Sequence, residues 1–245
     1  MNFKSSFFYL KIISYIKATR FYFGNIIRFL NRKKFQKSIS PSDAVTIFGE
    51  SFSKYGNHFI IKFLNEYSNN NNIDILNSSL SRFHQEFCPK TTEEALGVQL
   101  EGNGLSIFSY PWGKFGNNKT STKKDPKNSR FCGPSSEQFI INEGKSIIEL
   151  FKKISKNGYR PTKFPYSFIQ GVWMINKDKK KKFVVLQGNH RMAILSYLGF
   201  NKIQVRCDQF KVPKILEKDI EKWSEVASGK VPKYKAKEIF DKFFN

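Results

Sequence analysis

The most regular apolar pattern lies in the second half of the chain. Apolar residues recur there at helical spacing, namely Ile147, Ile148, Leu150, Phe151 and Ile154. The pair Asn157-Gly158 follows, and a glycine in this position commonly ends a helix. The pattern predicts a helix over residues 147–157.

Short apolar runs separated by charged turns follow this helix. Residues 168–175 and 183–186 have the composition of strands, and the charged residues 178–182 between them predict a hairpin. Residues 192–198 form a further apolar helical pattern, and residues 203–205 predict another strand. The order strand, turn, helix, strand predicts a mixed α/β (α+β) protein with a small mixed sheet and flanking helices.

The rest of the chain is less regular. Residues 38–43 look like a linker or the start of a helix. Residues 97–130 are rich in Gly, Asn, Lys, Ser and Pro, as in long loops. Helical patterns around Trp223 and Ile239 are expected to cover the sheet. We therefore expect a basic amphipathic segment at 1–37, a helical and loop-rich region at 38–130, and an α/β domain with C-terminal helices at 131–245.

The N-terminal residues 7–30 are apolar and aromatic, but four cations interrupt them: Lys11, Lys17, Arg20 and Arg28. A membrane-spanning helix needs about 18 or more residues almost free of charge, so a span is not predicted. A helix lying on an anionic membrane surface, with residues 7–34 as the contact, fits the pattern. A helix packed on the body of the protein fits it equally well.

Composition adds a strong positive charge to this picture. The chain of 245 residues is 40% hydrophobic and 16% aromatic, which is typical of a folded protein. Its formal net charge of +22 favours a polyanionic partner such as nucleic acid or an anionic membrane. An AT-rich genome, which enriches Lys, Asn, Ile, Phe and Tyr, explains the same charge without any such partner.

The cysteines are few and widely spaced, at Cys88, Cys132 and Cys207. They form no Cys-x-x-Cys pair, so their pattern predicts neither a disulfide framework nor a zinc site. A reducing compartment suits such a chain best. We expect a cytoplasmic protein, peripheral at the membrane if residues 7–34 contact lipid.

Candidate chemistry centres on the turn Gly188-Asn189-His190-Arg191, which connects a predicted strand to a predicted helix. Unpaired backbone N–H groups and the helix dipole favour an anion at such a helix N-terminus. Glycine allows close approach of the backbone, and arginine binds phosphate oxygens with two parallel donors. The turn is therefore a candidate phosphate-binding site.

Two other phosphate motifs are excluded. Residues 144–146 read Gly-Lys-Ser, but Phe139 occupies the position of the first glycine of a Walker A loop. No Gly-x-Gly-x-x-Gly sequence follows a predicted strand, so a dinucleotide site of the Rossmann type is not indicated.

Two motifs in this order resemble the ParB/sulfiredoxin-like superfamily. Residues 147–161 end Ile-Ser-Lys-Asn-Gly-Tyr-Arg-Pro, residues 183–199 contain the Gly-Asn-His-Arg turn, and the resemblance covers about residues 143–206. In that superfamily, a helix ending in Gly and then Pro precedes a hairpin, and a Gly-x-His-Arg turn binds nucleotide phosphates. The resemblance implies this fold and a bound nucleoside triphosphate, ATP or CTP with Mg²⁺.

Members of the superfamily differ in activity. ParB proteins bind DNA and hydrolyse CTP, sulfiredoxins use ATP to repair an oxidised cysteine, and some relatives phosphorylate free serine. Asn189 stands where sulfiredoxins carry a cysteine, which disfavours that chemistry. Gln187 stands where the kinase-like relatives tend to carry an acidic residue. Fold alone does not choose among these activities.

The leading hypothesis is a nucleotide-binding protein that transfers phosphate to a small or saccharide-like acceptor. We assign Glu143 and His190 as catalytic candidates, and Arg160 as a second phosphate contact besides the turn; metal ligands stay unassigned. Glu143 also fits a partner of the helix dipole, and His190 a structural hydrogen bond. The alternatives are a non-catalytic nucleic-acid-binding protein and a membrane-surface nucleotide sensor or adaptor.

Overall fold

The computed structural model describes residues 36–99, 102, 104–115, 129–163, 168–207 and 214–245. The expected membrane contact at residues 7–34 lies outside these residues. Residues 37–245 form one compact unit. Among the helices in the described ranges, none is long and apolar enough to cross a lipid bilayer.

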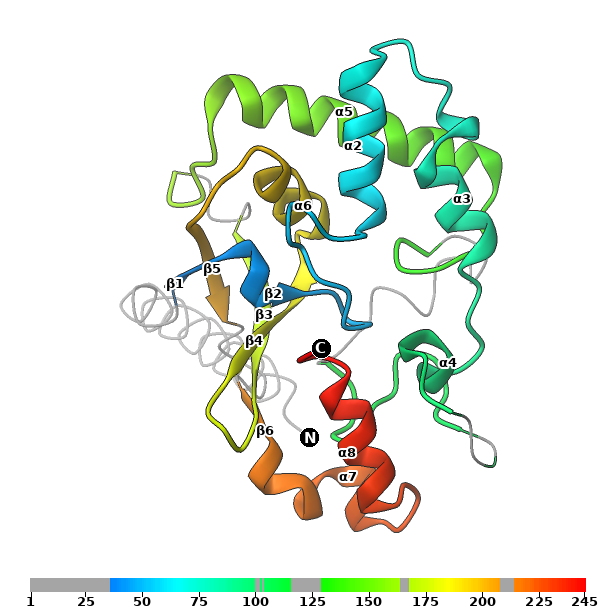
Figure 1. The fold of residues 1–245 in the computed structure, drawn as a ribbon, viewed down its shortest axis with the longest axis vertical. Coiled ribbons are helices and arrows are strands. Elements are labelled where there is room, and N and C mark those ends of the chain that lie inside the picture. Colours follow the sequence, from blue (N-terminus) through cyan, green and yellow to red (C-terminus); the bar gives the residue numbers. More distant parts are fainter. Residues whose placement is uncertain (1–35, 100–101, 103, 116–128, 164–167, 208–213) are drawn as a thin grey trace, which may run out of the picture. The chain divides into compact units, whose positions relative to one another are not determined.

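A mixed sheet lies at the centre of this unit (Figure 1). Its strands in the described residues are β1 (Gln36–Ile39), β2 (Ala44–Val45), β3 (Ile169–Ile175), β4 (Lys181–Gln187), β5 (Ile203–Cys207) and β6 (Lys214–Leu216). They are ordered β1-β5-β3-β4-β2, and β6 pairs with the distal part of β3. β3 and β4 form the predicted antiparallel hairpin, while β5 and β6 run parallel to β3. The mixed α/β class with flanking helices is confirmed.

Helices flank the sheet. They are α2 (Phe59–Asn69), α3 (Ser79–Glu86), α4 (Thr92–Leu96), α5 (Glu137–Asn157), α6 (Asn189–Tyr197), α7 (Ser224–Ala227) and α8 (Lys233–Asp241), with short 3-10 turns η2 (Pro41–Asp43), η3 (Ile75–Asn77) and η5 (Glu217–Lys222). The predicted helix 147–157 is the second half of α5, which begins about ten residues earlier. Ser136 caps its start by accepting a hydrogen bond from the backbone N–H of Phe139.

The segment 38–43, expected to be a linker or a helix start, contains the 3-10 turn η2 and also contributes its first two residues to β1. β1 and β2 are separated by only the short turn η2, yet they pair with β5 and β4 respectively. Ala44 lies opposite Phe183 and is fully buried. The sheet therefore takes strands from both sides of the boundary expected at residues 130/131, and that position does not divide two units in the structure.

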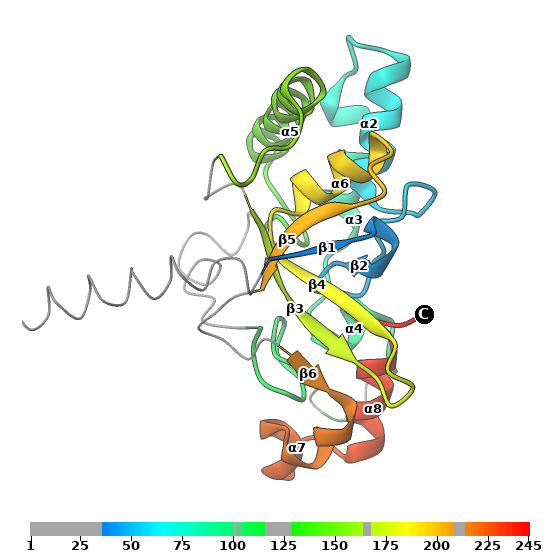
Figure 2. The ribbon, with the colours of Figure 1, turned by 90° about the vertical axis from the view of Figure 1, so that its left-hand side faces the viewer.

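Figure 2 shows α2, α5 and α6 toward one end of the β3–β4 hairpin and α7 and α8 toward the other. Alternation of side chains along the hairpin builds a core on each face of the sheet. On β4, Phe183 and Val185 face one core, together with α2, α5 and α6, whereas Val184 faces the other, together with α8. The second core includes a group of aromatic side chains, namely Tyr110, Phe115, Trp223, Phe240 and Phe243. The tail thus covers one face of the sheet, as the pattern in the sequence predicts.

Candidate functional site

The turn between β4 and α6 has the geometry of an open helix N-terminus. Gly188 adopts the left-handed conformation (φ 91°, ψ 27°) and no side chain caps the helix. A Cβ atom at Gly188 would lie 3.1 Å from Cγ1 of Ile169, so a larger residue would have to displace that side chain. The free first-turn N–H groups of α6, together with its dipole, favour an anion here.

Burial of α6 fixes this turn in place. Residues 192–196 of the helix are buried, and Ala193, Ile194 and Leu195 are completely inaccessible. The hydroxyl of Ser196 donates a hydrogen bond to the carbonyl oxygen of Phe52. Because the helix is held along its length, its N-terminus is a preorganised part of the fold.

A charged cluster lies directly beside the turn. Nε2 of His190 lies 2.7 Å from Oε1 of Glu143, and Nε of Arg130 lies 3.2 Å from the same oxygen. The Glu143 side chain is 5% exposed, that of His190 18% and that of Arg130 65%. The structure therefore brings the two catalytic candidates into contact and places an exposed arginine beside them.

The cluster keeps Glu143 ionised although the residue is buried. Burial raises the pKa of its carboxyl, but the hydrogen bond from His190 and the charges of His190, Arg130 and His84 lower it and outweigh burial. A carboxylate with a pKa below its usual value stays an acceptor at neutral pH. It can hold the imidazole of His190 in one orientation, as in other carboxylate–histidine pairs.

The other two histidines of the chain approach the same place. His58 caps α2, where its Nδ1 accepts from the N–H of Ile60 at 3.2 Å, and His84 lies on α3 with its Nδ1 3.3 Å from Oγ of Ser135. Burial, together with the charge of His190, lowers the pKa of His58 to about 3. Burial and His190 also lower the pKa of His84 to about 4, against the opposing charge of Glu143. Both side chains are neutral near pH 7.

Arg130 was not identified from the sequence. Arg130 lies in a loop that packs against the C-terminal end of α3. In this loop the N–H of Gly133 donates to the carbonyl of Phe87 at 2.7 Å, and the N–H of Ser135 donates to the carbonyl of His84 at 3.1 Å. A Cβ atom at Gly133 would lie 2.0 Å from the oxygen of His84. Only glycine permits this approach, and a glycine in a loop was the one available signal.

Of the other predicted phosphate contacts, Arg191 and Asn189 lie at the turn, whereas Arg160 does not contact it. Nη1 of Arg191 donates to the carbonyl oxygen of Phe168 at 3.3 Å, which holds the arginine next to its turn. Asn189 begins α6, and its Oδ1 is buried without a hydrogen-bond partner among the described residues. Arg160 is exposed, and no contact within the described residues joins it to the turn. The structure thus groups Gly188, Asn189, His190 and Arg191 with Glu143, but not Arg160.

Metal binding by protein groups alone does not fit the site. Within the described residues, no group of three or more His, Cys, Asp or Glu side chains is arranged to hold an ion. Mg²⁺ usually keeps several waters and is held by substrate phosphates plus one or two carboxylates. The charged cluster beside the turn contains one carboxylate, that of Glu143.

The site thus combines an open helix N-terminus, two arginines and a carboxylate–histidine pair. Such a set of groups can bind a phosphate and accept a proton beside it. Comparisons of the chain with protein-family models, with curated proteins and with solved structures find no match.

Proposed function

We propose that the protein binds a nucleoside triphosphate, ATP or CTP with Mg²⁺, and transfers its terminal phosphoryl group to a small or saccharide-like acceptor. The observation that carries the proposal is the contact between Glu143 and His190 at the uncapped N-terminus of α6. In this proposal the N-terminus of α6 binds phosphate, and the Glu143–His190 pair accepts a proton. Phosphoryl transfer needs both functions at adjacent positions.

In this proposal the turn and the arginines hold the phosphates. The first N–H groups of α6 bind phosphate oxygens, and Arg191 adds a charged donor from the same turn. Arg130, which is 65% exposed, can move from Glu143 toward the charge that develops on the transferred group. Mg²⁺ bound with the nucleotide would neutralise phosphate charge, and Glu143 is the carboxylate that would contact it.

His190 is the proposed general base. Its Nε2 hydrogen-bonds to Glu143, and no described residue hydrogen-bonds its Nδ1. As the acceptor hydroxyl attacks the terminal phosphorus, its proton passes to Nδ1, the bond to the leaving nucleoside diphosphate breaks, and Glu143 stabilises the imidazolium. His190 thus takes the proton of the acceptor hydroxyl, and Glu143 balances the positive charge that the imidazole gains.

Calorimetric titration with ATP, CTP and GTP in the presence of Mg²⁺ tests the binding step. We expect the wild-type chain to bind at least one of them, and Arg191→Ala to weaken that binding at least ten-fold. Arg160→Ala serves as the matched control, because Arg160 does not contact the turn, and it should bind as the wild type does. Circular dichroism and thermal unfolding establish that both variants are folded. Failure of the wild-type chain to bind any of the three nucleotides would contradict the proposal.

A further inference from the structure

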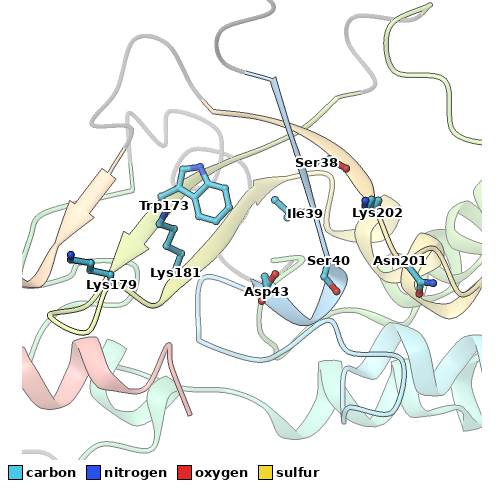
Figure 3. Close-up of a pocket in the computed structure, with 9 residues that line it drawn as sticks. All are labelled: Ser38, Ile39, Ser40, Asp43, Trp173, Lys179, Lys181, Asn201 and Lys202. Carbon is cyan, nitrogen blue, oxygen red and sulfur yellow. The ribbon is translucent and has the colours of Figure 1, made fainter.

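A second groove lies away from the Gly188 turn. It is an open depression of about 440 Å³ between the tip of the β3–β4 hairpin, the β1–η2 segment and the turn that follows α6 (Figure 3). Its lining residues are Ser38, Ile39, Ser40, Asp43, Trp173, Lys179, Lys181, Asn201 and Lys202. Asn201 and Lys202 follow the C-terminal end of α6, whereas Gly188 precedes its N-terminal end. The groove is therefore distinct from the candidate phosphate site.

The groove is positively charged. Lys179, Lys181 and Lys202 are exposed, and no acidic residue within the described ranges forms an ion pair with them. Asp43 is the one acidic residue among the residues that line it. Unpaired lysines grouped around a depression create a local field that attracts anions.

Two further lysines extend the charge beyond the groove. Lys37 and Lys214 lie close enough to Cys207 for their charges to oppose the rise in its thiol pKa, a rise that burial causes. Cys207 in turn accepts a hydrogen bond from Trp173, whose ring lines the groove. The basic surface thus continues onto β1 and β6, where Lys37 and Lys214 are exposed.

Trp173 is held as a fixed aromatic surface. Besides its bond to Cys207, its ring meets Phe183 edge-on, with centroids 5.2 Å apart and an interplanar angle of 68°. Figure 3 shows Lys179 and Lys181 on the hairpin side with Trp173, and Lys202 on the other side of β1. A flat ring flanked by cations is the arrangement on which successive bases stack while lysines contact the phosphates between them.

We infer that this groove binds a single strand of nucleic acid, with a base against Trp173 and the flanking phosphates on Lys179, Lys181 and Lys202. The net charge of +22 supplies the long-range attraction that such a strand requires. Ser38, Ser40 and Asn201 add neutral hydrogen-bonding groups that suit sugar and base edges. The inference does not depend on nucleotide binding at the Gly188 turn.

Fluorescence anisotropy with labelled dT12 and U12, measured for the full chain from about 50 to 300 mM salt, tests it. The test variant is Lys179→Gln/Lys181→Gln/Lys202→Gln, and the control is Lys145→Gln/Lys153→Gln/Lys156→Gln, which removes the same charge from the exposed side of α5. The test variant should bind at least ten-fold more weakly than the control. Its slope of log affinity against log salt should be smaller by about two, since each phosphate contact contributes about 0.7.

A second variant tests the stacking separately. Trp173→Leu should weaken binding roughly ten-fold, whereas Trp173→Phe, which keeps an aromatic ring, should retain most of it. Circular dichroism establishes that each variant is folded. Equal binding by the two triple variants overturns the inference, because nonspecific charge would then suffice. Tighter binding of an acidic polysaccharide such as polygalacturonate than of either oligonucleotide also overturns it, and identifies the groove as a saccharide site.

Discussion

His190 donates a hydrogen bond to Glu143 over 2.7 Å, and this contact connects the first turn of α6 to the N-terminal third of α5. The two helices also pack on one another through the core that α2 shares. A buried carboxylate that accepts a hydrogen bond from a histidine and pairs with an arginine is costly to disturb, because removing either partner leaves the carboxylate poorly solvated. The pair therefore positions His190 and at the same time contributes to the stability of this corner of the fold.

Glu143→Gln separates catalysis from binding. The amide keeps the shape of the carboxylate but cannot stabilise an imidazolium, so phosphoryl transfer should fall about 10²- to 10⁴-fold. The dissociation constant for the nucleotide without Mg²⁺ should change by less than about three-fold, since the turn that binds phosphate is intact. Turnover of the nucleotide and calorimetry measure the two quantities. Glu149→Gln, an exposed change on the same helix, should alter neither; a variant of Glu143 with full turnover would show that His190 is not the base.

Gly188→Ala tests the conformation of the turn. Gly188 has φ 91° with Ile169 only 3.1 Å from the position of a Cβ atom, whereas Gly199 has φ 79° with nothing within 4 Å. Gly199→Ala should cost only the left-handed backbone conformation, about 1 kcal/mol, and Gly188→Ala about 2–3 kcal/mol because the turn must also shift. Chemical denaturation measures both. Nucleotide affinity should fall in Gly188→Ala and stay at the wild-type value in Gly199→Ala. Equal nucleotide affinities of the two variants would mean that the turn at Gly188 does not bind phosphate.

The buried histidines predict a loss of stability in acid. The pKa values of His58 and His84 are about 3 and about 4 in the folded chain, against 6.5 when exposed, so the unfolded chain binds more protons below pH 6.5. The free energy of unfolding should therefore decrease as the pH falls from about 6.5 toward 4, by up to about 1.4 kcal/mol per pH unit for each histidine.

Two substitutions isolate this effect from the carboxylates of the chain. His58→Asn keeps an acceptor for the N–H of Ile60 and removes the titrating ring, and His84→Gln removes the other. Urea denaturation at several pH values should give a shallower acid slope for each variant than for the wild type. Parallel slopes would mean that the two rings are not held neutral in the folded chain.

Glu50 predicts a pH dependence of opposite sign. Burial raises its pKa from 4.5 to about 7, although the charge of Lys62 opposes the rise. The folded chain then binds the extra proton between pH 4.5 and 7, so this contribution to stability is present below about 4.5 and lost as the pH rises through 7. Glu50→Gln should stabilise the protein at pH 8 by the order of 1–3 kcal/mol, with little effect at pH 4.5. Glu86→Gln, at an exposed position, is the control for thermal unfolding at both pH values.

Local sequence patterns were sufficient to predict the β3–β4 hairpin, α6 and the end of α5, because each of these elements depends on residues close in sequence. They missed β1 and β2, because β1 has four residues and β2 only two, and Pro41 between them resembles a linker. They also missed the start of α5, since Glu143 and Gly144 occupy buried positions in its first turns and interrupt the apolar pattern. A strand of two residues exists only because β4 pairs with it.

Some residues of the candidate site could likewise be predicted from the sequence, and others could not. Gly188, His190 and Arg191 lie in one short motif, and Glu143 lies near the preceding helix motif, so the sequence identified them. Arg130, His58 and His84 come from three other segments and share no spacing. Their approach to His190 follows from the packing of α2, α3 and the 130–135 loop, which no local pattern contains.

The pairing of β1 and β2 with strands far along the chain bears on how the protein folds. Ala44 pairs with Phe183, about 140 residues later, and β1 joins the sheet through β5, which comes later still. During synthesis, residues 36–45 leave the ribosome long before their partners exist, and closing such long loops is slow. The nascent chain must therefore keep β2 unpaired until β4 has emerged and β1 unpaired until β5 has emerged, so the sheet cannot close before residue 207 is available.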